Sequence, residues 1–209
     1  MIQTADILPK LFGNKSIVKT MRLFLLNAES SFEMSEVRTR TKSTPAALRS
    51  DMTRLRNIGF VKKKTIMKMT PAKTKKGKGT KKKVETWQLN TNFPYLSALK
   101  LMLLSDHMIN KTEAVKRMRR AGKIKLIVLS GIFLRETEGD RVDVLVVGDK
   151  LNRNSLETAL RGLESEVGKE LSYAIMDSDE FNYRLGMYDK FIRDILDYPH
   201  EKLVNKIGV

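Results

Sequence analysis

The chain has 209 residues, of which 40 are Lys or Arg and 24 are Asp or Glu, so its formal net charge is +16. This length allows one large or two small domains, and an apolar share of 41% is enough to build hydrophobic cores. The absence of cysteine excludes disulfides, thiolate zinc sites and cysteine nucleophiles, and two histidines cannot form a histidine-rich metal site. No run of about 18 apolar residues occurs and the N-terminus lacks a secretory pattern, so we expect a cytoplasmic protein with no cofactor.

The charge is unevenly distributed along the chain. Residues 1–122 hold 27 basic and eight acidic residues, whereas residues 123–209 hold 13 basic and 16 acidic ones. An excess of this size in one half indicates a polyanionic partner, either nucleic acid or an anionic membrane surface. We favour nucleic acid, because the lysine-rich segment lacks the bulky apolar face that interfacial helices use.

Three helices and a hairpin are predicted in the first 92 residues. Ser16 can cap a helix that runs to about residue 27, and residues 35–41 form a second, shorter helix. Ser43 or Thr44 can cap a third helix, whose apolar stripe ends at Ile58 and which stops at Gly59. Residues 60–69 and 84–89 then have the composition of two strands, with residues 71–80 as the hairpin tip.

Three helices followed by a two-stranded ribbon make up a winged helix-turn-helix. The run STPAALRSDMTRLRNIGFVKKK resembles the recognition helix and wing entry of winged-helix transcription regulators. The resemblance covers about residues 11–90 and implies a DNA-binding domain over residues 1–92. We expect Trp87, on the returning strand, to pack between the wing and the helices rather than to stack on bases.

Two groups of residues are the candidate DNA contacts. Residues 62–83 hold 11 lysines and no acid, which suits contacts with phosphates, and such contacts add affinity without sequence information. On the third helix, arginines can bind guanine in the major groove bidentately, although Arg54 and Arg56 could equally be solvated or touch phosphate. The candidates in the helix and before it are Arg40, Lys42, Ser43, Thr44, Ala46, Arg49, Ser50, Thr53 and Arg54. The candidates in the wing are Lys73, Lys75, Lys76, Lys78, Lys81, Lys82 and Lys83.

The rest of the chain predicts a second, smaller domain. Residues 93–122 are expected to form a helical linker. From residue 123 strands alternate with helices, with strands expected at 124–129, 142–147, 171–176 and 202–207 and helices at 155–167 and 179–196. The sequence therefore predicts an α+β fold of two domains, in which residues 123–209 form a small α/β domain.

The segment from residue 125 to 149 is similar to the minimal nucleotidyltransferase fold, whose members carry a glycine turn followed by an Asp-x-Asp strand. The resemblance implies that the turn holds a triphosphate and that the carboxylates hold Mg²⁺. Gly131 and Asp143 match this pattern, but Arg141 falls on the first Asp position and Ser172 on that of a third carboxylate. We therefore expect an inactive, nucleotidyltransferase-like domain with no metal site, which senses a ligand or dimerises.

Asp143 has a simpler explanation as an acid paired with Arg141 or Arg135. The same residues give a weaker hypothesis, a pocket for an anion or a nucleotide. The candidates for this pocket are Gly131, Arg135, Arg141 and Asp143.

The combination of both domains resembles a group of prokaryotic transcription regulators. The leading hypothesis is a sequence-specific regulator that binds double-stranded DNA as a homodimer, in the cytoplasm and associated with the nucleoid. A small molecule or nucleotide is the candidate effector. One alternative is a nucleotidyltransferase that acts on nucleic acid or protein through Asp140 and Asp143. The other is a non-specific architectural binder of DNA or RNA.

Overall fold

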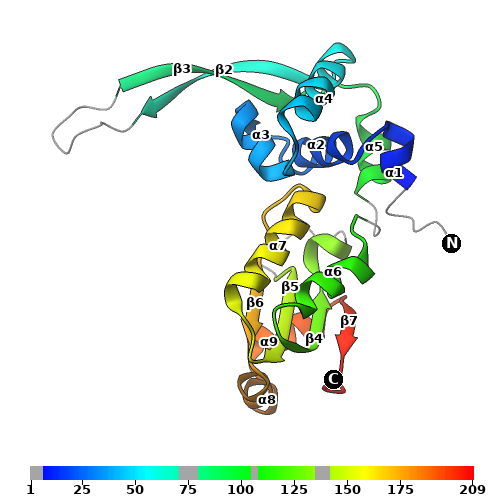
Figure 1. Cartoon of the computed structure of the whole chain (residues 1–209), viewed down its shortest axis with the longest axis vertical. Coiled ribbons are helices and arrows are strands. Elements are labelled where there is room, and N and C mark those ends of the chain that lie inside the picture. The colour runs from blue at the N-terminus through cyan, green and yellow to red at the C-terminus, as the bar shows by residue number, and fades with distance from the viewer. Residues whose placement is uncertain (1–6, 71–79, 105–107, 135–141) are drawn as a thin grey trace. The chain divides into compact units, whose positions relative to one another are not determined.

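A computed structural model describes residues 7–70, 80–104, 108–134 and 142–209, and it shows a mixed α+β fold with two separate sheets (Figure 1). The chain divides into an N-terminal unit, Leu8–Leu103, and a C-terminal unit that contains Leu104–Val209. Among the helices of the described residues, none has both the length and the apolar character that crossing a bilayer requires. The α+β class expected from the sequence is confirmed.

The N-terminal unit combines a layer of helices with a small antiparallel sheet. Its helices are α1 (Ile7–Phe12), α2 (Lys15–Leu26), α3 (Met34–Thr41), α4 (Pro45–Asn57) and α5 (Leu96–Leu103). Its strands are β1 (Ser31–Phe32), β2 (Val61–Thr70) and β3 (Thr80–Leu89), in the order β1-β3-β2. β2 and β3 form a long ribbon that extends away from the helices of the unit (Figure 1).

The ends of α4 agree with its sequence signals. The Thr44 hydroxyl accepts a hydrogen bond from the Ala47 amide at 3.3 Å. Pro45 occupies the first helical position, where its missing N–H would have had no intrahelical partner. Gly59 follows the helix with φ +79°, a left-handed conformation that a residue without Cβ adopts freely. These signals therefore set both ends of α4, and Gly59 leads the chain directly into β2.

Two expectations for these helices are wrong in detail. Ser16 does not cap α2, because the Asn14 side chain accepts the hydrogen bond of the Ile17 amide at 2.8 Å. Ile58 does not extend the apolar stripe of α4, since 59% of it is exposed. The helix ends just before Ile58, and the fully buried Phe60 takes the next place in the core.

β1 is a two-residue strand that the sequence analysis did not predict. Its Phe32 lies opposite Trp87 of β3, and both side chains are buried. The Phe32 ring also meets the ring of Phe24 on α2 edge-on, with centroids 5.8 Å apart. β1 thus closes the sheet against α2, and Trp87 is a core residue, as expected.

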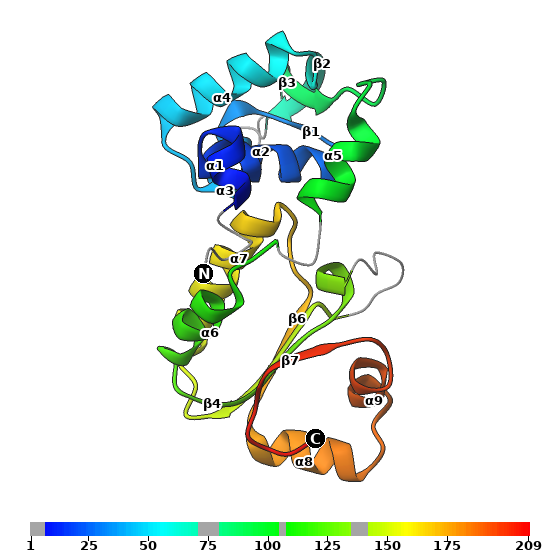
Figure 2. The ribbon, with the colours of Figure 1, turned by 90° about the vertical axis from the view of Figure 1, so that its right-hand side faces the viewer.

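The C-terminal unit is a mixed sheet with helices on both faces (Figure 2). Its strands are β4 (Lys123–Leu129), β5 (Val144–Asp149), β6 (Tyr173–Met176) and β7 (Glu201–Asn205), in the order β6-β5-β4-β7. Its helices are α6 (Lys111–Arg119), α7 (Arg153–Val167), α8 (Ser178–Gly186) and α9 (Lys190–Leu196), with a 3-10 helix at Gly131–Leu134. α7 connects the parallel pair β5 and β6, and the other pairs are antiparallel. β6 and β7 are the edge strands.

The sheet of this unit separates two layers of core. On one side Leu126 and Val128 of β4 pack with Phe181 of α8 and Ile192 of α9. On the other side α6 and α7 pack against each other, and α6 also contacts β4. One expectation is wrong here, because the helix predicted at 179–196 is broken into α8 and α9. Asp189 starts the second helix by accepting hydrogen bonds from the amides of its second and third residues.

The segment 93–122, expected to be a linker, is divided between the two units. α5 packs on α2, where Arg22 Nε donates a hydrogen bond to the Leu103 carbonyl oxygen at 2.9 Å. α6 belongs to the C-terminal unit, and Asn110 caps it by accepting from the Glu113 amide at 3.0 Å. The boundary therefore lies between α5 and α6, so the cations of α6 belong to the C-terminal unit.

Candidate nucleic-acid interface

One side of α4 is polar and exposed along its whole length. Leu48, Met52 and Leu55 are about 1% exposed and hold the helix to the unit. The opposite face therefore meets solvent, as helical spacing requires. All of the helix candidates on this side are exposed: Thr44, Ala46, Arg49, Ser50, Thr53 and Arg54. Arg56, for which the sequence analysis left base contact and solvation open, is exposed as well, and so is Asn57, which it did not consider.

Arg49 and Arg54 are exposed cations on this face. Within the described part of the chain Arg49 has no ion pair or side-chain hydrogen bond, and its carbonyl oxygen accepts from the Thr53 hydroxyl at 2.8 Å. Arg56, by comparison, donates a long hydrogen bond of 3.4 Å to Asn57. A guanidinium that is free and mounted on a rigid helix can present its donors in the planar, two-pronged geometry that a base edge or a phosphate accepts.

The other three candidates lie at the end of α3 and in the turn before α4, and they differ in their contacts. The Ser43 hydroxyl accepts hydrogen bonds from the hydroxyls of Ser16 at 2.8 Å and Thr41 at 2.9 Å, so it links α2 to the turn. The Arg40 guanidinium lies over the Phe32 ring, 5.2 Å from its centroid. Lys42 is exposed and left-handed at φ +51°, where it ends α3. Of the three, Lys42 alone points its charge at solvent without such a structural contact.

Asp51 is a buried carboxylate on the inner side of α4 that the sequence analysis missed. It is 1% exposed, and its Oδ1 accepts a hydrogen bond from Asn14 Nδ2 at 3.0 Å. Its Oδ2 is buried and has no partner among the described residues. Asp51 lies three residues after Leu48 and four before Leu55, so helical spacing places it within the apolar stripe of α4. That position was the signal in the sequence that Asp51 is buried. This contact ties α4 to the cap of α2 and fixes the direction of the helix.

The β2–β3 ribbon carries lysines on both of its faces. Residues directly opposite each other in an antiparallel pair share a face, and neighbours along a strand alternate. Lys68 is opposite Lys82, so both lie on one face, whereas Lys81 and Lys83 lie on the other. Lys81, Lys82 and Lys83 are all exposed and have no partner within the described residues. The other wing candidates, Lys73, Lys75, Lys76 and Lys78, lie outside the residues that the structure describes.

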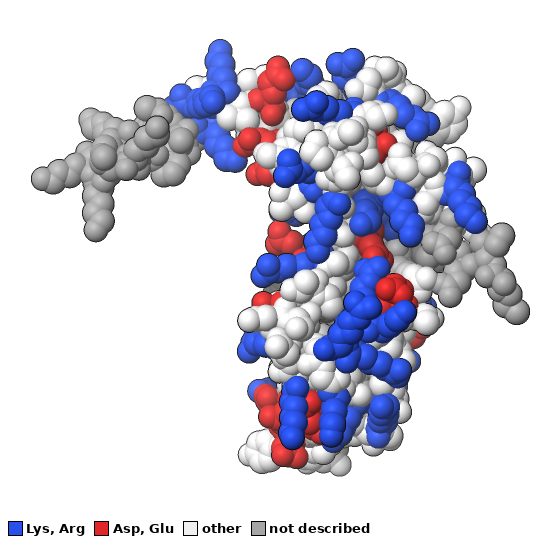
Figure 3. Space-filling view, viewed as in Figure 1, with Lys and Arg blue, Asp and Glu red and all other residues white. Residues whose placement is uncertain are grey.

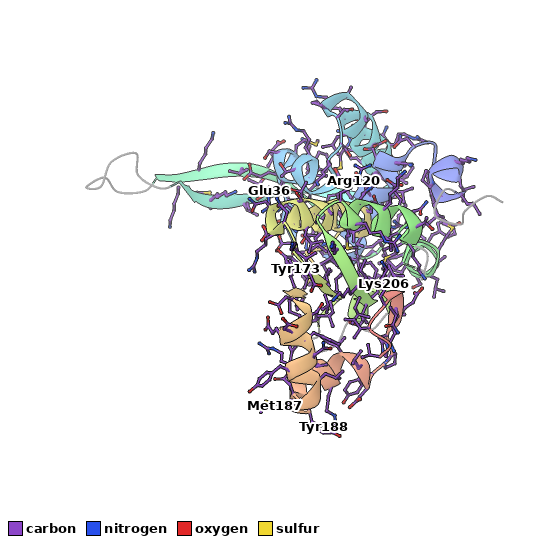
Figure 4. The ribbon with its side chains drawn as sticks, turned by 60° about the horizontal axis from the view of Figure 1, so that its bottom comes forward. Glu36, Arg120, Tyr173, Met187, Tyr188 and Lys206 are labelled. Carbon is purple, nitrogen blue, oxygen red and sulfur yellow. The ribbon has the colours of Figure 1, made fainter. Side chains whose placement is uncertain are left out.

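Two lysines of the ribbon are engaged within the protein. Lys68 Nζ lies 2.6 Å from Glu33 Oε1 and 3.7 Å from Glu36 Oε1, and Figure 4 labels Glu36 near the base of the ribbon. The hydrogen bond to Glu33 raises the pKa of Lys68. Lys63 Nζ lies 3.0 Å from Glu85 Oε2 and 5.5 Å from the centroid of the Trp87 ring. The first pair attaches the ribbon to the start of α3, and the second joins β2 to β3 within the ribbon.

Asp143 in the C-terminal unit is bound by backbone amides. Its Oδ1 accepts from the Ile132 amide and its Oδ2 from the Ser172 amide, both at 2.9 Å. Gly131 is left-handed at φ +54°, and a Cβ there would overlap Asp143 Oδ1. The carboxylate therefore joins the 3-10 turn, the start of β5 and the segment before β6.

The remaining candidates of the anion pocket, Arg135 and Arg141, lie outside the described residues. Asp140, which the transferase alternative would use, lies outside them as well. Within the described ranges, no group of three or more His, Asp or Glu side chains gathers as a metal site would require. Comparison of the chain with protein-family models, with curated proteins and with solved structures finds no match. Its function is therefore inferred from the residues and their geometry.

Proposed function

We propose that the chain is a transcription regulator that binds double-stranded DNA sequence-specifically through a winged helix-turn-helix in its N-terminal unit. The observation that carries the proposal is the order of elements: α3, a short turn and α4 lead through Gly59 into a lysine-rich ribbon. β1, between α2 and α3, pairs with the returning strand of that ribbon. A helix of this kind enters the major groove with its exposed side chains, while a neighbouring helix supports it from behind.

In this mechanism α4 reads base edges and the ribbon supplies affinity. Arg49 and Thr53 lie four residues apart, so they project from one face of α4 and can reach neighbouring base pairs. Each good bidentate contact of an arginine with guanine contributes about 1–3 kcal/mol of discrimination. The ribbon neutralises phosphates through Lys81, Lys82 and Lys83. Binding then weakens as salt rises, and log K falls against log salt with a slope of about 0.9 for each neutralised phosphate.

The C-terminal unit has the proposed role of a nucleotidyltransferase-like domain without transferase activity, which dimerises or senses a ligand. The support is Asp143, whose two carboxylate oxygens each accept a backbone amide, so both are engaged within the fold instead of being presented together to a metal ion. Homodimer formation, an effector of nucleotide or other small-molecule chemistry, and residence at the nucleoid belong to the same proposal.

A second candidate is a non-specific architectural binder, because unpaired lysines on both faces of the ribbon favour phosphate contact with any duplex. Selection from a pool of random duplexes separates the two functions. The regulator is expected to enrich one site and the architectural binder none. Failure of the protein to bind any duplex at low salt would reject both.

Arg49→Ala tests the mechanism of the regulator. The ratio of affinity for the selected site to that for unrelated duplex is expected to fall about 5- to 100-fold, the equivalent of one base contact. Arg38→Ala is the matched control, since Arg38 is an exposed arginine on the neighbouring helix α3. It removes the same charge and should leave the ratio unchanged. An equal fall in both variants would show that charge, and not base contact, sets the preference.

A further inference from the structure

The C-terminal unit has a cationic face on the outer side of α6, next to the edge strand β7. Thr112, Val115, Lys116 and Arg119 have the spacing that places residues on one side of a helix. Together with Lys111 and Leu203 they line an open pocket of about 410 Å³. Figure 3 shows Lys and Arg side chains gathered over α6.

Most of the charge on this face has no counter-charge. Lys116 and Arg119 are exposed and have no ion pair within the described part of the unit. Lys111 is bound to both carboxylate oxygens of Glu201, at 2.8 and 2.6 Å, so Glu201 offsets only that lysine. Arg120, at the end of α6, is also exposed (Figure 4). The face therefore has a local positive charge that the described residues do not neutralise.

Helix stability explains only part of this pattern. Cations near the C-terminal end of a helix interact favourably with its dipole, which accounts for Lys116 and Arg119. The same argument makes Lys111 unfavourable in the first turn, and Lys123 begins the next strand, where the dipole has no role. Arg117 has a structural role, because it binds Glu166 at 2.8 Å and so holds α6 to α7. Lys111 has its partner in Glu201, so the exposed Lys123 is the cation near this face that helix stability leaves unexplained.

The shape of the face favours an extended ligand with many phosphates over a small molecule that carries phosphate. Small molecules are held in concave sites that cover most of their surface, whereas this pocket is open to solvent. The unpaired cations Lys116, Arg119 and Arg120 lie within about 6 Å along the axis of α6, so together they can meet more than one phosphate of a neighbouring row. Duplex DNA presents such a row, with one charge per about 1.7 Å of its axis.

We propose that the α6–β7 face is a second contact for the phosphate backbone of duplex DNA, so that the chain binds DNA through both of its units. This inference rests on the proposed function, since the ligand is the duplex that the N-terminal unit selects. The contact adds affinity without sequence preference, as phosphate contacts do.

The first experiment measures the salt dependence of binding by the full chain. Lys116→Gln/Arg119→Gln should lower the slope of log K against log salt by about 1.8, which is about 0.9 for each lost phosphate contact, and should leave sequence preference unchanged. The matched control is Lys169→Gln/Lys190→Gln, which removes two exposed charges from the same unit. Lys169 leads into β6, the edge strand opposite β7, and Lys190 begins α9 on the other face of the sheet. Equal slopes in both double variants would overturn the inference.

The second experiment locates the DNA directly. The chain has no cysteine, so a photo-crosslinker can be attached to Thr112→Cys in the pocket, with the exposed Asn182→Cys on α8 as the control. Crosslinks to duplex are expected from position 112 and not from position 182. If millimolar ATP abolishes the crosslink while the duplex stays bound, the face holds a nucleotide instead and the inference is wrong. Wild-type protein that binds no duplex at all rejects the proposed function itself, before any variant is compared.

Discussion

The two units use charge in different ways. The N-terminal unit, Leu8–Leu103, holds 22 basic and five acidic residues, a net charge of +17, whereas Leu104–Val209 holds 18 of each. In the C-terminal unit the charges tie elements together, as Arg117 of α6 does with Glu166 of α7 and Lys125 of β4 with Asp149 of β5. In the N-terminal unit, Lys81, Lys82 and Lys83 are exposed and have no acidic partner among the described residues. Ion pairs therefore link elements mainly in the C-terminal unit, where the α6–β7 face is the exception, whereas the exposed lysines of the ribbon are available to a ligand.

The largest effect should come from the carboxylate that holds the C-terminal unit together. Gly131→Ala places a Cβ on Asp143 and forces a left-handed alanine, so it should cost about 2–4 kcal/mol of unfolding free energy. Gly59→Ala is the control, because Gly59 is also left-handed but has open space where its Cβ would stand. It should cost about 1–2 kcal/mol. Urea unfolding followed separately for each unit measures both, and equal costs would show that Asp143 contributes little.

The free lysines of the ribbon should give the next largest effect, on DNA affinity rather than on stability. Lys81→Gln/Lys82→Gln/Lys83→Gln should lower affinity for any duplex on the order of 10- to 100-fold at 0.15 M salt and reduce the salt slope by about 2.7. The melting temperature should not fall, since these lysines bind no acid among the described residues. Fluorescence anisotropy at several salt concentrations measures the slope. An unchanged slope would mean that the ribbon does not touch phosphate.

Local signals in the sequence predicted most of the elements. A proline with a capping threonine and a glycine in the right places set α4, because caps act within a few residues of a helix end. β1 was missed since two residues show no periodicity, and its pairing with Gln88 and Trp87 joins segments far apart in the chain. The break before Asp189 did carry a signal, a good capping residue within an apparently continuous helical pattern.

The candidate sites were harder to predict than the fold. The exposed side of α4 follows from its apolar stripe, so helical spacing alone identified Arg49 and its neighbours. The Ser43 hydroxyl accepts hydrogen bonds from two other hydroxyls, and one of the donors, Ser16, lies on a different helix. The sequence around Ser43 does not indicate this contact. Asp143 accepts amides 11 and 29 residues away, whereas sequence reasoning searches first for an opposite charge. Contacts that depend on the placement of loops cannot be predicted from the pattern and spacing of residues in the sequence.

A pair of lysines on the ribbon sharpens the comparison within the N-terminal unit. Lys68 and Lys82 lie opposite each other, but of the two only Lys68 binds carboxylates among the described residues. The hydrogen bond from Glu33 raises the pKa of Lys68, so the pair stabilises the fold at neutral pH and is lost only as pH rises through that raised value. Lys68→Gln should therefore lower the melting temperature slightly. Lys82→Gln should leave it unchanged or raise it, because like charges opposite each other repel.

The difference between the melting temperatures of these two variants should narrow in 1 M salt, where the Debye length falls to about 3 Å. Differential scanning fluorimetry at low and high salt is sufficient to measure it. A lower melting temperature in both variants, independent of salt, would show that the lysine side chains act through packing of their alkyl chains. The ribbon would then resemble the C-terminal unit, in which charged residues serve the fold.

The smallest effect tests whether an exposed pair contributes to the C-terminal unit at all. Lys125 Nζ lies 2.7 Å from Asp149 Oδ2, and this hydrogen bond lowers the pKa of Asp149 below its ordinary value of 3.8. A lowered pKa means that the pair stabilises the fold above about pH 4 and that the gain is lost as pH falls through the folded pKa. Asp149→Asn should then melt at a slightly lower temperature than wild type at pH 7, and the two melting temperatures should converge below pH 3.

The double variant Lys125→Gln/Asp149→Asn completes a thermodynamic cycle that isolates the pair from other effects of each change. If the coupling energy is zero at pH 7, the exposed Lys125–Asp149 pair does not stabilise the unit. Only less exposed ion pairs, such as Arg117 with Glu166, would then contribute to its stability.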